Sequence, residues 1–240
     1  MTRVRLQLRA EVMLLARNGE QLLLTLGIPV MLLAFFGLVD VLPSGDLDGV
    51  DFLVPGVMAL AIMSTSMVSL GIATGFERSY LVLKRLGATP LTRGELVTAK
   101  IFSVVVVEIV QVAILIPLGI ALGWNGSSIG VPVTVLVILL GTAAFAGIGI
   151  FLAGQLRAEV NLAAQNGLYL VLLLLGGMVI PNESLPGALG AAAAALPSSA
   201  LSTTLRAAMT DGAVSVGPLA VLAVWAIVAP AVAARRFRWS

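Results

Sequence analysis

An apolar stretch between Lys100 and Gly123 contains one carboxylate, Glu108, and Gln111 follows it three residues later. Residues three apart lie on the same face of a helix, so these two polar side chains point in a similar direction. A charge at the centre of a bilayer costs about 2.5–3.5 kcal/mol on insertion scales, so we expect Glu108 to face protein or water, or to be protonated. The pair predicts either a polar lining of a transport path or a hydrogen-bonded seam between helices.

Other side chains that commonly perform chemistry are missing from the chain. It has no histidine and no cysteine, so the usual general base near neutral pH, the commonest metal ligand and the thiolate nucleophile are all absent. A single membrane carboxylate cannot form an aspartyl pair, and no Ser–His arrangement can be assembled. We therefore expect no catalytic residue, no metal site and no enzyme activity in this chain.

The composition is that of a membrane protein. Of the 240 residues, 59% are hydrophobic and only 11% are charged, and the mean hydropathy is +1.08, whereas soluble domains carry about 25% charged residues. The apolar segments are continuous, which favours helices over the alternating strands of a barrel. We predict an all-α polytopic fold forming a single transmembrane domain over residues 1–240. Its six spans lie at about 22–39, 52–76, 101–123, 131–156, 162–180 and 216–234.

The basic residues divide the termini and loops into two groups. One group contains thirteen of the fourteen lysines and arginines: Arg3, Arg5, Arg9, Arg17, Arg78, Lys84, Arg85, Arg93, Lys100, Arg157, Arg235, Arg236 and Arg238. The other group contains Arg206 together with the acidic residues Asp46, Asp48, Asp51, Glu183 and Asp211. Because an excess of Lys and Arg marks the cytoplasmic side, the sequence predicts that both termini are cytoplasmic.

Two further segments belong to neither a span nor a simple loop. Pro186 and Pro197 interrupt the uncharged stretch before the last span, and a seventh crossing would place the Arg-rich tail outside. We therefore predict a re-entrant or interfacial pair of short helices over about 184–210. At the other end of the chain, Val4, Leu8, Val12 and Leu15 form a stripe at helical spacing. They predict an amphipathic helix over about 3–19 that either lies in the membrane surface, with this stripe in lipid, or simply leads into the first span.

The loop over residues 77–100 has the pattern of a short helix held between two spans. Leu83 and Leu86, with Tyr80 or Leu81, form an apolar side, and Gly87 can end the helix. Pro90 forces a turn, and Thr92 with Glu95 forms a capping box that starts the next helix. Such a helix would transmit force to both spans. A loop whose positive charge only sets the topology is the alternative.

The same segment carries a resemblance to a known family. Glu77-Arg78, Leu83-Lys84-Arg85-Leu86, Ala88-Thr89-Pro90-Leu91, Arg93, Glu95-Leu96 and Lys100 resemble the signature of type-2 ABC exporter permeases, which include bacterial drug-efflux and daunorubicin-resistance permeases. In that family the loop is a coupling helix that docks on a separate ATP-binding subunit. The resemblance implies that Glu77, Arg78, Lys84, Arg85 and Pro90 couple to this subunit. The chain departs from the family pattern at Leu81, where relatives often have glycine, and at Gly87, where they often have arginine.

The resemblance implies the rest of the assembly. The chain lacks a G-x-x-x-x-G-K-[ST] phosphate loop, so ATP and magnesium are expected in the partner subunit and no cofactor in this chain. We expect a second permease copy or a similar permease chain, contact with membrane lipid, and no nucleic acid. The expected location is the bacterial inner membrane. The expected function is ATP-driven export of an amphiphilic drug, lipid or lipid-linked product.

Two other functions remain open from the sequence. A proton-coupled secondary carrier would use Glu108 as its proton site, although such carriers usually contain more than one intramembrane ionisable group. A purely structural assembly factor is also compatible with the sequence. Gly71 and Gly75 form a G-x-x-x-G in the second span, a spacing that lets helix backbones approach closely. We expect these two glycines to serve packing within the chain rather than a dimer seam.

Overall fold

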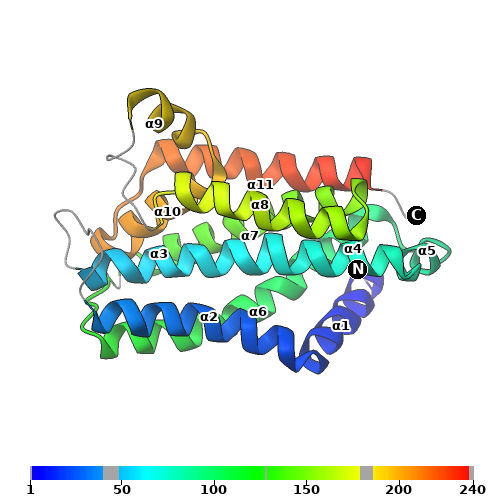
Figure 1. Cartoon of the computed structure of the whole chain (residues 1–240), viewed down its shortest axis with the longest axis horizontal. Helices are drawn as coiled ribbons and strands as arrows, with labels where there is room; N and C mark the ends of the chain where they lie inside the picture. The colour runs from blue at the N-terminus through cyan, green and yellow to red at the C-terminus, as the bar shows by residue number, and fades with distance from the viewer. Residues whose placement is uncertain (1, 40–48, 128, 179–185, 238–240) are drawn as a thin grey trace.

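The computed structural model describes residues 2–39, 49–127, 129–178 and 186–237. Asp46, Asp48, Glu183 and Arg238, the end of the fifth predicted span, and residues 184 and 185 of the predicted external segment lie outside these ranges. The described residues form helices joined by short turns (Figure 1). In chain order they are α1 Thr2–Arg17, α2 Gly19–Leu38, α3 Gly49–Met63, η1 Ser64–Ser69, α4 Leu70–Ser79, α5 Val82–Gly87, α6 Arg93–Ala121, α7 Val131–Gln155, α8 Ala158–Leu175, α9 Gly187–Ala194, α10 Pro197–Arg206, η3 Ala207–Asp211 and α11 Val216–Arg236.

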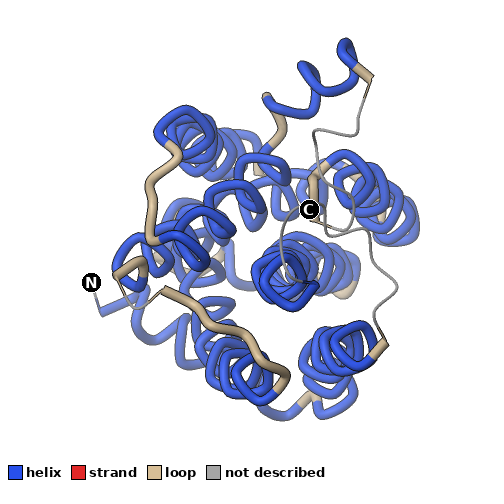
Figure 2. Tube along the Cα trace, turned by 90° about the vertical axis from the view of Figure 1, so that its left-hand side faces the viewer, coloured by secondary structure: helices blue, strands red, loops and turns tan. Residues whose placement is uncertain are grey.

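Six helical segments within the described ranges are long and apolar enough to cross a membrane: α2, the continuous α3–η1–α4, α6, α7, α8 and α11. They run along a common axis, which Figure 2 views nearly end-on. The α3–η1–α4 segment has the largest share of buried residues of the six, while α2 and α11 have the smallest. The start of α1, the end of α11 and α5 lie at one end of the bundle, here called the α5 end (Figure 1).

The segment before the last span is a bent pair. Helices α9 and α10–η3 meet at 84°. Because α8 ends and α11 begins at the end of the bundle opposite α5, the pair returns without crossing (Figure 1). The prediction of an all-α fold with six spans and a bent helix pair before the last one is confirmed.

The apolar stripe of the first helix faces the rest of the protein, whereas one of our two predictions placed it in lipid. Helix α1 packs mainly on α6, and the stripe of Val4, Leu8, Val12 and Leu15 is partly buried. The expectation that this stripe lies in lipid is therefore wrong. Glu11 falls within the same stripe at helical spacing and pairs with Lys100 of α6, which turns the stripe towards the protein. The exposed apolar residues of α1 are instead Leu6, Met13 and Leu14.

Small residues on α7 let the other spans approach its backbone. A Cβ atom at Gly147 would meet the backbone of Ala229 and Pro230 in α11, and one at Gly149 would lie 2.5 Å from the carbonyl oxygen of Met67. Met67 belongs to η1, a π-helical segment in the middle of the second span. Such segments widen a helix locally, and the wider turn of η1 fits against α7 only because Gly149 has no side chain.

We expect Gly149→Ala to destabilise the protein by about 1–3 kcal/mol, because the added methyl group collides with backbone that cannot move independently. Gly167→Ala is the matched control, since no heavy atom lies within 4 Å of its added Cβ and alanine favours helix over glycine by about 1 kcal/mol. Thermal unfolding of the two purified variants would test this. Equal melting temperatures for both would contradict the packing argument.

Candidate functional site

The segment between α4 and α6 has the geometry of a short helix fixed at both ends. Thr92 and Glu95 form the predicted capping box: the Thr92 backbone N–H donates to Glu95 Oε2 at 2.8 Å, and the Glu95 N–H donates to Thr92 Oγ1 at 3.2 Å. The capping-box prediction is therefore confirmed. The turn is also tied to α1, because Arg3 Nη1 donates to the carbonyl oxygen of Pro90 at 2.8 Å.

Helix α5 is anchored by its leucines. Leu83 is fully buried in a cluster with Leu70, Leu96 and Phe237, and Leu86 packs against this cluster while partly exposed. The predicted apolar side is thus confirmed for Leu83 and Leu86. It is wrong for Tyr80 and Leu81, which are 70% and 51% exposed, because the chain turns between α4 and α5.

That turn places Leu81 in a left-handed conformation. Its φ is 60°, and it is the only positive φ among the described non-glycine residues. A Cβ atom makes this conformation unfavourable by about 1–2 kcal/mol, a cost that glycine avoids. The departure of this chain from the family pattern at Leu81 therefore falls on a backbone position that suits glycine. Gly87, the other departure, is the last residue of α5 and does not have a positive φ.

We expect Leu81→Gly to keep or raise the melting temperature, because removing the strain offsets the greater flexibility of glycine in the unfolded chain. Leu81→Val should lower stability, by about 1 kcal/mol or more, since a β-branched residue is a strong outlier at positive φ. Val82→Gly is the control for an added glycine, because Val82 begins α5. A lower melting temperature for Leu81→Gly than for Leu81→Val would contradict the strain.

The predicted coupling residues do not all face solvent: some are held by contacts within the protein, and others are exposed. Arg78 Nη1 donates to the carbonyl oxygens of Ala153 at 2.8 Å and Leu156 at 3.3 Å, so its guanidinium holds α4 to the end of α7. Lys84 and Arg85 are exposed. Within the described chain their side chains have no hydrogen bond or ion pair, so among the predicted coupling residues these two present free charge at the α5 end.

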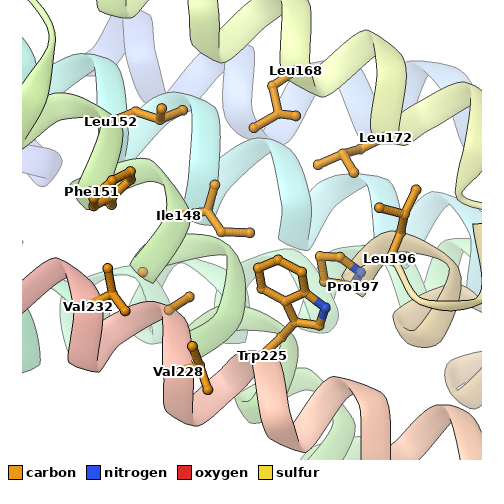
Figure 3. Close-up of a pocket in the computed structure, with 12 residues that line it drawn as sticks. Ile148, Phe151, Leu152, Leu168, Leu172, Leu196, Pro197, Trp225, Val228 and Val232 are labelled. Carbon is orange, nitrogen blue, oxygen red and sulfur yellow. The ribbon is translucent and has the colours of Figure 1, made fainter. Parts of the chain in front are cut away.

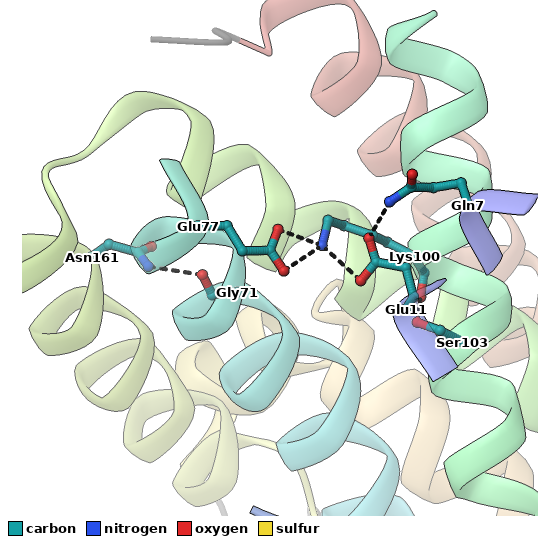
Figure 4. Close-up of polar contacts among 7 residues, drawn as sticks. All are labelled: Gln7, Glu11, Gly71, Glu77, Lys100, Ser103 and Asn161. Carbon is teal, nitrogen blue, oxygen red and sulfur yellow. Dashed lines mark hydrogen bonds and ion pairs between the residues drawn. The ribbon is translucent and has the colours of Figure 1, made fainter. Parts of the chain in front are cut away.

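Glu77 belongs to a buried ion cluster that sequence reasoning missed. Lys100, on α6, is fully buried, and its ammonium Nζ lies 3.1 Å from Glu11 Oε2 and 2.8 Å from Glu77 Oε2. Figure 4 shows the two carboxylates, from α1 and α4, pointing at the same nitrogen. Gln7 Nε2 donates to the other oxygen of Glu11 at 2.8 Å. The cluster therefore joins α1, α4 and α6 at the α5 end.

Two signals could have indicated this cluster. Glu11 is the one acidic residue of α1, and it lies on the helix's apolar stripe rather than among its arginines. Lys100 belongs to the family signature without an assigned role. An isolated acid on an apolar face predicts a buried partner, but the sequence does not say which of the fourteen basic residues is that partner.

We expect Lys100→Met to destabilise the protein by about 3–5 kcal/mol, because it leaves two carboxylates together without their counter-charge. The triple variant Lys100→Met with Glu11→Met and Glu77→Gln should recover most of this loss, since it removes the charges together. Thermal unfolding of the purified variants measures both. A triple variant no more stable than the single one would contradict the electrostatic explanation.

Glu108 and Gln111 lie in helix seams inside the bundle. Glu108 is 1% exposed and its Oε2 is hydrogen-bonded to the hydroxyl of Thr142 in α7. The Thr142 hydroxyl also lies 2.8 Å from the carbonyl oxygen of Ile138. Gln111 Nε2 donates to the carbonyl oxygen of Thr25 and to Thr65 Oγ1, both at 3.0 Å.

Gly71 and Gly75 face two amides of α8. Asn161 Nδ2 donates to the carbonyl oxygen of Gly71 at 2.9 Å (Figure 4), and Gln165 Nε2 donates to that of Gly149 at 2.9 Å. A Cβ atom at Gly71 would collide with the Gln165 side chain, and one at Gly75 would lie 2.5 Å from Asn161 Nδ2. The two glycines thus give the α8 amides access to the backbone. Sequence reasoning did not assign Asn161 or Gln165.

Two cavities lined by described residues differ in character. The first, of about 370 Å³, has an apolar lining from α7, α8, α10 and α11 (Figure 3): Gly147, Ile148, Phe151, Leu152, Leu168, Leu172, Leu196, Pro197, Trp225, Val228, Ala229 and Val232. The second, of about 540 Å³, lies where α1 meets α2 and extends between α4 and α6, and we call it the elbow cavity. Glu108 and Gln111 line neither cavity. Among the described residues no group of three acidic side chains could hold a metal ion.

Comparison with known proteins decides the family. A family model described as ABC-2 type transporter matches residues 2–210 of the 240. The chain belongs to this family. The ABC-2 membrane domain is a multi-pass transport subunit without an ATPase domain, and such a permease implies an ATP-binding partner subunit. No curated protein and no solved structure matches the chain. The matched region of the permease includes α5, the ion cluster and most of the bent helix pair.

Proposed function

We propose that the permease exports an amphiphilic molecule, a drug, lipid or lipid-linked product, and that two ATP-binding subunits drive it. The observation that carries this proposal is α5, a short helix joined to two spans, fixed by a buried leucine and presenting two exposed basic side chains. In this proposal the α5 end is cytoplasmic, and Lys84 and Arg85 contact the ATP-binding subunit. The charge distribution supports the orientation, because basic residues concentrate at this end.

The proposal includes a second permease chain, either a copy or a similar one. One chain supplies only six spans, and a path for an amphiphile would run between the two permeases. ATP and magnesium would bind in the partner subunits. The likeness to drug-efflux and daunorubicin-resistance permeases supports an amphiphilic substrate. The proposed location is the bacterial inner membrane, with both termini in the cytoplasm.

The structure gives no support to the proton-coupled carrier. That function needs a carboxylate that exchanges protons with water on both sides in turn. Glu108 is instead enclosed between α6 and α7 and bonded to Thr142.

We expect Lys84→Glu with Arg85→Glu to abolish co-purification of the ATP-binding subunit, because the reversed charges would repel the surface that the basic residues attract. The measurement is a pull-down of tagged permease from its native membrane, with the ATPase activity of the eluate as readout. Arg235→Glu with Arg236→Glu is the matched control, since these exposed residues carry the same charge at the same end.

An ATPase that is present with the unmodified permease and the control, but lost in the Lys84–Arg85 variant, would establish the partner and its docking site. A permease that elutes alone in nanodiscs, with no ATPase activity, would contradict the exporter. Loss of the partner in both charge-reversed variants would contradict α5 as the specific contact.

A further inference from the structure

The elbow cavity combines a charged end with a mainly apolar interior. At the α5 end its lining includes the ion cluster of Glu11, Glu77 and Lys100. One turn or more deeper, the lining is mainly apolar and includes Leu70 of α4 and Val107 of α6, together with the polar side chains of Gln21, Thr65, Ser69 and Ser103. Seven residues separate Lys100 from Val107, which is about 10 Å along the helix axis. The cavity therefore changes from ionic to mainly apolar over about the length of a short acyl segment.

The charged end has an excess of negative charge. Two carboxylates share one ammonium, and among the described residues Lys100 is the only cation within ion-pairing distance of either. The side chains of Lys100 and Glu11 are 1% and 7% exposed, whereas that of Glu77 is 21% exposed. The charge that a ligand in the cavity could reach is therefore that of Glu77. Arg17 also lines the cavity, but it is exposed and screened by solvent.

Two aromatic rings line the same cavity as this carboxylate. Phe76 and Tyr80 both line the cavity, and they stack on each other with ring centroids 6.1 Å apart and planes inclined by 27°. Aromatic faces attract alkylated ammonium groups, particularly where a carboxylate lies nearby. This contact and the unbalanced carboxylate are independent features of the lining, and both favour the same ligand chemistry.

We propose that the elbow cavity binds an amphiphile with a cationic ammonium head group, which contacts Glu77, Phe76 and Tyr80 while its chain extends along Leu70 and Val107. This inference rests on the proposed export function, for which it supplies a substrate class and a binding site. The same chemistry is available from a single-chain cationic amphiphile and from a membrane lipid with an ammonium head group. Both would enter from the leaflet at the α5 end.

The absence of cysteine from the chain allows a direct test. Ala73→Cys places one thiol in the lining of the cavity, and Ala88→Cys places one on the exposed surface after α5 as the control. The purified permease in phosphatidylglycerol nanodiscs is alkylated with N-ethylmaleimide. The probes are dodecyltrimethylammonium and dodecyl sulfonate, compared at equal membrane-bound concentrations.

The ammonium probe should slow alkylation of Ala73→Cys by about tenfold, the effect of one favourable charge contact in a partly buried site, and should leave Ala88→Cys unchanged. The sulfonate should protect neither thiol. Equal protection by the two probes, or protection by neither, would overturn the proposal.

Two further variants in the Ala73→Cys background test the residues themselves. Glu77→Gln should abolish the preference for ammonium, and Glu95→Gln, which changes an exposed carboxyl outside the cavity, should not. Because Glu77 also holds the ion cluster, Tyr80→Leu serves as a second variant. Its ring is mostly exposed, so the fold should persist while the probe concentration needed for protection rises about threefold. Full protection in both variants would overturn the assignment.

A lipid arm separates the two sources of the head group. If phosphatidylethanolamine added to the nanodiscs protects Ala73→Cys without any probe, the occupant is a membrane lipid; if only the single-chain probe protects, it is a smaller amphiphile. Both results support the cavity. The assay uses no ATP-binding subunit, so its failure alongside a co-purifying ATPase would overturn only the cavity, and protection without any ATPase partner would overturn only the exporter.

Discussion

The arrangement of this protein depends on one constraint: hydrocarbon cannot hydrogen-bond polar groups, so each polar side chain in a span needs a partner inside the protein. Some of these side chains bond within their own helix, as Ser66 does to Ile62, but others bond between helices. Glu108 joins α6 to α7, Gln111 joins α6 to α2 and η1, and Gln165 joins α8 to α7. A few polar residues in an otherwise apolar chain thereby select which helix faces meet, a choice that apolar contacts alone leave open.

Close approach of the helices complements these bonds. Glycine at positions 71 and 149 exposes carbonyl oxygens that the α8 amides reach. The same absence of a side chain at Gly149 accommodates the wider turn of η1. The buried second span therefore contacts its neighbours through its backbone as well as through its side chains. This gives it little freedom to shift alone, and movement of its end at α4 would involve α7 and α8.

At the α5 end, charged side chains make the contacts between helices instead. Lys100 joins α1, α4 and α6 through two carboxylates, and Arg78 joins α4 to α7. These contacts surround the two junctions from which α5 extends, while Lys84 and Arg85 remain free. A force applied to α5 would thus reach four helices through short, charge-assisted contacts, which is the property that the proposed contact with an ATP-binding subunit requires. The elbow cavity lies beside the same junction, so a ligand in the proposed site at Glu77 would contact the helices to which α5 is joined.

The sequence by itself determined the features that depend on local or one-dimensional physics. Runs of apolar residues specify the spans. Two prolines, together with the need for an even number of crossings to keep the Arg-rich tail on the same side as the other basic residues, specify the bent pair. Thr92 and Glu95, three residues apart, specify the start of α6. The tertiary structure alone decided which polar groups meet. Glu11 and Lys100 are 89 residues apart, and their pairing depends on the direction in which α1 folds back on α6, which no local pattern encodes. The lipid-facing assignment of the α1 stripe was wrong for that reason: amphipathic spacing identifies an apolar face, but whether lipid or another helix covers it is settled by packing.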